Sequence, residues 1–273
     1  MKIFIGILVF LSAGMQGLSQ KLAYHDWKFA YMMHAEPKHV NEMVKLFGDS
    51  KKPLHVYFDC DSTLKPEHFE ALSRLNICYM RFHIRKPQKF YCSGLDKLHV
   101  DTLELGGQTH LFLEDASKIK ELKRLHLTVF IPDSTLTKPP AFDQITSLHI
   151  SLSPVKDIST IIGSLKKLKL LDLAKMDAGL DLVASMNVLK DAPIEELWMY
   201  LVNVNVPEVE KIGFPNLKKC VLRLNNVKTF PYTDFIGRCP KLESIDLTAN
   251  GFSEKYIRGM QEKYPHVKII RDY

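Results

Sequence analysis

The stretch CPKLESIDLTANGF, residues 239–252, decides the fold of this chain. Its apolar residues Leu242, Ile245 and Leu247 follow the spacing L-x-x-L-x-L, and an Asn-Gly pair comes shortly after them. The last two apolar positions alternate with a polar residue, which is the periodicity of a β-strand that buries one face. The stretch therefore predicts a short strand followed by a tight turn.

The same spacing recurs along most of the chain at intervals of 22–26 residues. Between the copies lie segments such as DISTIIGSLKK and DLVASMNVLKD, whose apolar residues recur at helical steps of three and four. One strand and one helix cannot bury their own apolar faces, whereas stacked copies can, as a parallel sheet with helices on one side. The central apolar residue of each copy stands at positions 56, 78, 103, 125, 148, 171, 197, 220, 245 and 270.

This pattern resembles the leucine-rich repeat family, whose repeats have this length and spacing. The resemblance covers the chain from about residue 50 to its C-terminus. It implies an α/β solenoid, or horseshoe, of about ten repeats, with a parallel sheet on the concave face and helices on the convex face.

Some positions depart from the family pattern. Asn is common at the ninth position of the repeat, where it satisfies backbone groups in the turn, but here it occurs only at Asn225 and Asn250. At the N-terminus we expect a capping helix over residues 36–49 and a capping strand near residues 27–33. Cys78 and Cys220 take the central apolar position, so we expect both to be buried. No role is assigned to Cys60, Cys92 or Cys239.

The first residues differ from the rest of the chain. Lys2 precedes an apolar run over residues 3–13, and small and polar residues follow, which is typical of a secretory signal peptide. We expect residues 1–19 to be removed, residues 20–50 to cap the solenoid, and residues 51–273 to form it. The protein would then be exported, and would be secreted, periplasmic or surface-associated. The apolar run is too short to span a bilayer and no later run is longer, so no membrane span is expected.

The charge distribution argues against nucleic acid as a partner. The 273 residues carry a net charge of +6, but no run of five or more like charges occurs. Lys and Arg are scattered among acidic residues, as on the surface of an ordinary folded protein.

The concave face is the expected functional surface. Side chains on alternate strand positions point out of the sheet there, and many belong to types that carry protein interfaces. We therefore expect a non-catalytic binding module, without a cofactor, that recognises a protein or peptide. The candidate binding residues are Tyr57, Tyr79, Arg81, Glu104, His126, His149, Asp172, Trp198, Tyr200, Arg223 and Asp246.

Two other classes of function stay open on the sequence. Glu104, His126, His149 and Asp172 fall on successive predicted strands, and these residue types bind zinc and other divalent metals. A metal-binding protein or metal-dependent enzyme is therefore one alternative, and a structural envelope or surface protein is another. No nucleophile-elbow, zinc-protease or phosphate-loop motif is present in the sequence, so we do not expect an enzyme.

The signal-peptide hypothesis has a direct test. N-terminal sequencing of the exported protein should find a mature chain that begins at or close to Gln20. An intact Met1 on soluble protein in the cytoplasm would contradict the hypothesis.

Overall fold

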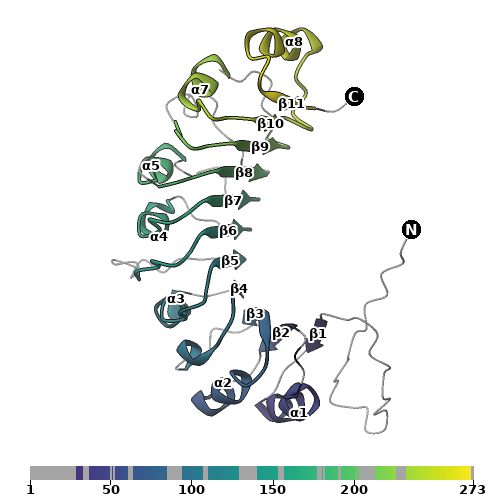
Figure 1. The fold of residues 1–273 in the computed structure, drawn as a ribbon, viewed down its shortest axis with the longest axis vertical. Helices are drawn as coiled ribbons and strands as arrows, with labels where there is room; N and C mark the ends of the chain where they lie inside the picture. Colours follow the sequence, from purple (N-terminus) through teal and green to yellow (C-terminus); the bar gives the residue numbers. More distant parts are fainter. Residues whose placement is uncertain are drawn as a thin grey trace, which may run out of the picture. The chain divides into compact units, whose positions relative to one another are not determined.

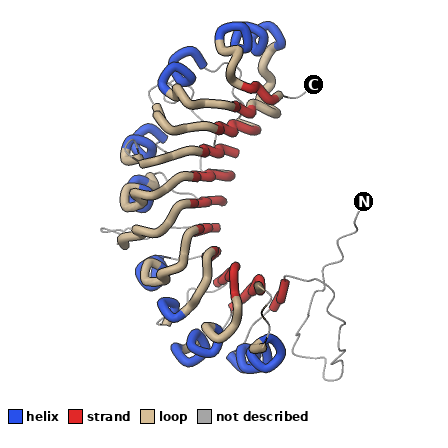
Figure 2. The backbone as a smooth tube through the Cα atoms, viewed as in Figure 1, coloured by secondary structure: helices blue, strands red, loops and turns tan. Residues whose placement is uncertain are grey.

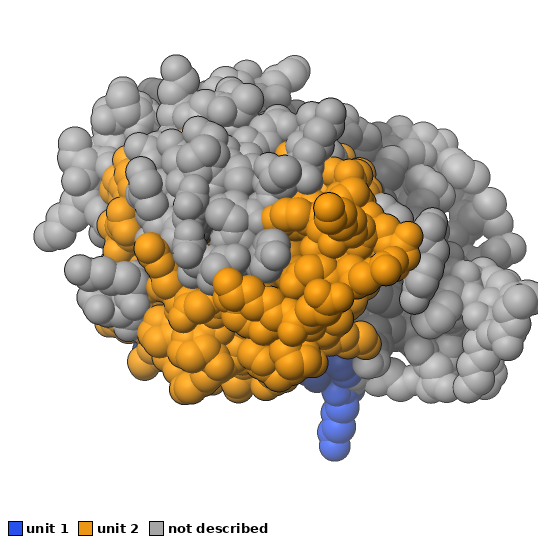
Figure 3. Space-filling view, turned by 90° about the horizontal axis from the view of Figure 1, so that it is seen from above, with its two compact units in different colours: residues 1–122 blue, residues 123–273 orange. Residues whose placement is uncertain are grey.

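The fold alternates strands and helices along the chain (Figures 1 and 2). The described residues separate into two compact units, residues 1–122 and 123–273, which Figure 3 draws in separate colours. The expected signal peptide lies outside the described residues. The computed structural model describes residues 29–32, 37–49, 51, 53–60, 64–84, 94–106, 110–128, 140–152, 157–176, 180, 182–189, 192–200, 202, 213–225 and 232–271.

The first unit is built from four parallel strands and the helices between them. Each strand pairs with its neighbours in sequence. The expected capping helix and capping strand are both present, as α1 and β1. The strands are β1 (Phe29–Met32), β2 (Leu54–Cys60), β3 (Ile77–Ile84) and β4 (Thr102–Gly106). The helices are α1 (Pro37–Phe47), α2 (Pro66–Leu72), the 3-10 helix η1 (Leu95–Lys97) and α3 (His110–Ala116).

The second unit repeats the same arrangement over seven parallel strands, again paired in sequence order. The strands are β5 (Arg124–Thr128), β6 (Ser147–Ser151), β7 (Leu170–Ala174), β8 (Glu196–Tyr200), β9 (Lys219–Arg223), β10 (Ser244–Asp246) and β11 (Lys268–Ile270). The helices are α4 (Ser159–Ile162), α5 (Leu182–Asn187), α7 (Tyr232–Arg238) and α8 (Glu254–Lys263).

Helices α4, α5 and α7 lie on one side of the strands of the second unit (Figures 1 and 2). We call the opposite side of β5–β11 the open face, because no helix of the described residues covers it. An α/β arrangement with parallel strands and helices on one side is what the repeat pattern predicts.

The apolar positions of the repeat form the core of the second unit. In the copies that contain β5–β10, the three positions of L-x-x-L-x-L are at most 2% exposed, and a buried Leu, Ile or Met side chain contributes about 1.5–3 kcal/mol through apolar burial. The central column contains Leu125, Leu148, Leu171, Leu197, Cys220 and Ile245. The burial expected for Cys220 is confirmed.

A repeated backbone turn ends the strands. Leu152, Lys175, Leu224 and Ala249 occupy the same place in four repeats, and each has a positive φ of 52–59°. This conformation costs a residue with a side chain about 1 kcal/mol or more. Hydrogen bonds to the next repeat offset this cost. The backbone N–H of Leu152 donates to Ala174 O at 3.0 Å, and that of Lys175 donates to Tyr200 O at 2.7 Å.

Asn225 and Asn250 form a buried asparagine ladder at these turns. Asn225 Oδ1 accepts from the backbone N–H of Val202 at 2.8 Å, and its Nδ2 donates to Met199 O at 2.9 Å. Asn250 Oδ1 accepts in turn from the N–H of Asn225 at 2.8 Å, and its Nδ2 donates to Leu222 O. Each amide thus adds hydrogen bonds to backbone groups of the preceding repeat.

The register of β3 differs from the expectation. Leu54 pairs with Ile77 and His55 pairs with Tyr79, so Cys78 is an extra residue at an irregularity in the strand. The central apolar position therefore belongs to Met80, which is fully buried, and the prediction that Cys78 fills it was wrong. Cys78 is only partly buried, with its Sγ 3.6 Å from Leu54 O.

The register of the last strand also differs, by one residue. Ile245 pairs with Ile269 and Asp246 pairs with Ile270, whereas the spacing placed position 270 in the central column. Two adjacent isoleucines make either register compatible with the apolar pattern.

No helix within the described ranges is both long enough and apolar enough to cross a membrane.

The asparagine ladder predicts different losses of stability in two matched Asn→Ala variants. Asn250→Ala should destabilise the chain by on the order of 3 kcal/mol, because several buried backbone groups lose their partner at about 1–3 kcal/mol each. Asn216→Ala should change stability by less than about 0.5 kcal/mol, because the Asn216 side chain accepts a hydrogen bond from the exposed Lys241 side chain. Urea unfolding of both variants checks this, and equal midpoints would contradict the ladder's role.

Candidate functional site

The open face of the second unit carries a row of in-register side chains. Successive strand pairings bring together His126 with His149, His149 with Asp172, Asp172 with Trp198, Trp198 with Val221, and Val221 with Asp246. Neighbouring strands lie about 4.8 Å apart, so this row is a continuous surface. Tyr200 and Arg223 pair with each other two residues further along their strands.

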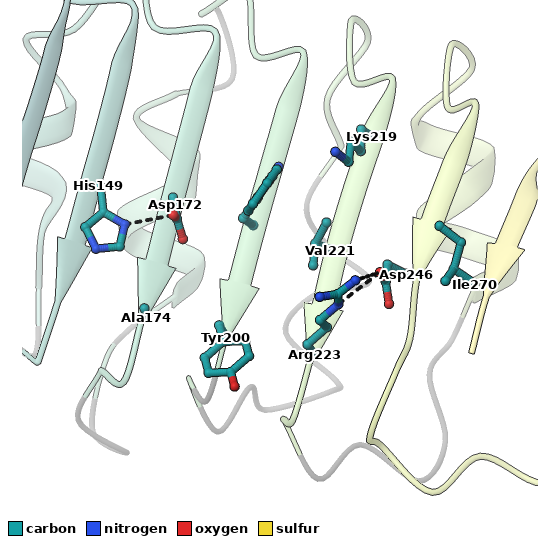
Figure 4. Close-up of a pocket in the computed structure, with 10 residues that line it drawn as sticks. His149, Asp172, Ala174, Tyr200, Lys219, Val221, Arg223, Asp246 and Ile270 are labelled. Carbon is teal, nitrogen blue, oxygen red and sulfur yellow. Dashed lines mark hydrogen bonds and ion pairs between the residues drawn. The ribbon is translucent and has the colours of Figure 1, made fainter. Parts of the chain in front are cut away.

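An open hollow of about 380 Å³ lies on this face (Figure 4). Six of the eleven candidate binding residues line it together: His149, Asp172, Trp198, Tyr200, Arg223 and Asp246. Ala174, Lys219, Val221 and Ile270 complete the lining. The hollow combines aromatic, cationic and anionic groups, its lining comes from six strands, β6–β11, and it is the candidate functional site of the second unit.

At one side of the hollow, His149 and Asp172 form a hydrogen-bonded pair. His149 Nδ1 lies 2.7 Å from Asp172 Oδ2, and Figure 4 shows the two side chains pointing toward one another. Both side chains are about one quarter exposed. The ring of His126 lies against that of His149, with 5.3 Å between the centroids and an angle of 56°. The pair therefore has a fixed orientation while it stays accessible from solvent.

Trp198 is held between two charged side chains. Its Nε1–H donates to Glu196 Oε2 at 3.1 Å. Lys219 Nζ lies 4.6 Å from the centre of the ring system, within the range of a cation–π contact. The same ammonium lies 3.9 Å from Glu196 Oε2. These contacts orient the indole on the open face.

Arg223 and Asp246 make the strongest ion pair of the hollow. Arg223 donates from Nε and Nη2 to Asp246 Oδ2 at 2.9 and 2.5 Å, and the backbone N–H of Thr248 donates to Asp246 Oδ1 at 3.0 Å. Burial alone raises the pKa of the Asp246 carboxyl, but the hydrogen bonds from Arg223 and Thr248 outweigh it and hold the pKa below its ordinary value of 3.8. The carboxylate is thus kept charged beneath the guanidinium.

A separate cluster occupies the corresponding face of the first unit. Arg81 Nε lies 3.1 Å from Glu104 Oε1, and the Tyr79 hydroxyl donates to Glu104 Oε2. The ring of Tyr79 packs against His55 and Tyr57, with centroid distances of 5.2 and 5.4 Å. Burial, together with the hydrogen bond to Glu104, raises the pKa of the Tyr79 hydroxyl.

The corrected β3 register changes the order of these residues. Tyr57 and Glu104 both pair with Arg81, and Tyr79 pairs with His55 and Thr102. With position 78 in the central column, Tyr79 would lie between Tyr57 and Glu104, and Arg81 would lie in the next row; the pairing shows that this order is wrong.

Two of the four residues of the alternative metal-binding set are engaged in other contacts. Glu104 is bound by Tyr79 and Arg81 within the first unit, and Asp172 is bound by His149 within the second. In the described part of the chain, no group of three or more His, Cys, Asp or Glu side chains is placed to hold a metal ion.

Four lining residues were not among the candidate binding residues: Ala174, Lys219, Val221 and Ile270. Lys219 is the first residue of β9, and the alternation that places Val221 and Arg223 on the open face also places Lys219 there. Ile270 reaches the hollow only because the register of β11 is shifted by one residue.

No protein-family model matches this chain, and none of the curated proteins compared with it is similar enough to count as a relative.

The Arg223–Asp246 pair predicts an acid-dependent loss of stability. Because folding lowers the pKa of Asp246, its stabilising contribution is present above about pH 4 and is lost as the pH falls through the folded-state value. In Asp246→Asn this part of the pH dependence should disappear, and stability at neutral pH should fall by about 1–3 kcal/mol. Unfolding curves between pH 2 and 7 check this, with the exposed Asp143→Asn as the control. A variant curve parallel to the wild type would contradict the assignment.

Proposed function

We propose that this protein is an exported, leucine-rich-repeat-like solenoid that serves as a non-catalytic binding module. Its ligand is a protein or peptide that lies on the open face of the second unit. The observation that carries the proposal is the hollow in which Trp198, Tyr200 and Arg223 meet on neighbouring strands.

The residue types in the hollow support binding. Trp, Tyr and Arg dominate the energetics of protein interfaces, because each joins a large contact area to a polar tip. Tyr200 is 37% exposed, so its ring is accessible to a ligand. A face that presents these groups without a described helix over it fits a partner that covers them.

The fixed orientation of the side chains also supports binding. His149 is held by Asp172, Arg223 by Asp246, and Trp198 by Glu196 and Lys219. Side chains that are already ordered lose less conformational entropy when a ligand covers them, at about 0.5–1.5 kcal/mol for each long side chain. The hollow is therefore organised before binding.

Export is part of the proposal and rests on the signal-like residues 1–19. The solenoid assignment rests on the repeat spacing and on the parallel strand–helix alternation in both units.

A selection experiment tests the binding site. Peptides selected from a random display library on the wild-type chain should lose about 1–3 kcal/mol of affinity for Trp198→Ala and for Tyr200→Ala, because an interface anchor contributes about this much. Titration calorimetry measures the affinities, and thermal melting verifies that each variant is folded.

Two control variants lie away from the hollow. Lys166→Ala changes an exposed residue outside the strands, and Tyr256→Ala removes a matched aromatic ring from α8. Affinity that survives both open-face changes and falls in these controls would place the binding site elsewhere.

A further inference from the structure

We propose that the hollow of the second unit selects an extended peptide in which two acidic side chains flank an apolar one, in the order acidic-x-apolar-x-acidic. This inference rests on the proposed binding function and specifies the chemistry of the ligand. It follows from which charges of the hollow are exposed and from how they are spaced along β9.

The exposed charge of the hollow is positive, although its formal charges nearly balance. The side chains of Asp246 and Asp172 are only 5% and 23% exposed, and each carboxylate is already engaged by Arg223 or His149. The side chains of Arg223 and Lys219 are 47% and 43% exposed. A ligand that enters from solvent therefore meets the two cations before the two carboxylates.

The two cations lie at opposite ends of one strand. Lys219 and Arg223 are the first and last residues of β9, and Val221 lies between them on the same face (Figure 4). Four residues of a strand span about 13 Å, and side chains at even spacing share one face. An extended peptide aligned with β9 has the same geometry, so acidic residues four apart reach both cations.

The centre of the hollow is apolar. Val221 is 7% exposed and forms the floor, and its strand partner Trp198 stands beside it. Ala174 and Ile270 add apolar lining at the sides. The residue midway between the two acidic groups of the ligand would therefore be apolar or aromatic.

Glu196 makes the two ends of the hollow unequal. Its side chain is 39% exposed and lies 3.9 Å from Lys219, so it partly offsets that charge. Arg223 is paired as well, but with a carboxylate that is only 5% exposed, and its planar guanidinium binds carboxylates in the best geometry. The acidic residue at Arg223 is therefore expected to contribute more affinity than the one at Lys219.

A defined set of peptides tests the inference on the full chain. The probe is Gly-Ser-Glu-Ser-Phe-Ser-Glu-Ser-Gly, with matched peptides in which both Glu are replaced by Gln or by Lys, or are moved next to Phe. Surface plasmon resonance should show about tenfold tighter binding of the probe than of the Gln peptide, and weaker binding still of the Lys peptide. The preference should shrink as salt is added.

Variants of the chain assign the preference to the two cations. Lys219→Glu should reduce the preference for the probe, and Arg223→Gln/Asp246→Asn should reduce it further. The double change removes the guanidinium without leaving the buried carboxylate charged. Lys166→Gln removes an exposed charge elsewhere and should leave the preference unchanged.

The outcomes separate this inference from the proposed function. If Gln and Glu peptides bind equally and both lose affinity in Trp198→Ala, the hollow is the site but the acidic preference is wrong. If none of these peptides binds while library-selected peptides do, the inference fails and the proposed function stands. If binding is unchanged in Trp198→Ala, the hollow is not the site and both fail.

Discussion

Each strand–helix repeat of this chain has an apolar face that it cannot bury alone, and the structure depends on neighbouring repeats burying it. The apolar columns of β5–β10 lie against one another at nearly zero exposure, and the asparagine ladder satisfies turn backbone groups across the same repeats. This constraint fixes every second strand position. It leaves the alternate positions on the open face without a role in the core, so they are available for binding.

The hollow shows how those alternate positions become a site. Its side chains come from separate repeats, and short contacts across strands hold them: His149 to Asp172, and Arg223 to Asp246. The repeat places the side chains in rows, and the ion pairs fix the orientation of the side chains within a row. The two carboxylates are less exposed than Lys219 and Arg223, so a ligand at the proposed site would meet mainly positive charge.

The spacing L-x-x-L-x-L predicted most strands almost to the residue, because burial tolerates one register only where apolar and polar positions alternate. It predicted the wrong register where a strand offers two residues for the central apolar position. These are Cys78 and Met80 in β3, and Ile269 and Ile270 in β11. The candidate rows of the second unit were predictable from the same alternation. The contacts within them were not, because the direction of a long side chain such as Arg223 depends on its neighbours across the sheet.

The central claim is that a ligand covers the open face of the second unit. Hydroxyl-radical footprinting of the full chain, with and without a bound peptide, tests it most directly. The account predicts that oxidation of Trp198 and Tyr200 falls on binding while oxidation of Tyr256 on α8 is unchanged. Unchanged oxidation of Trp198 and Tyr200 at saturating peptide would contradict it.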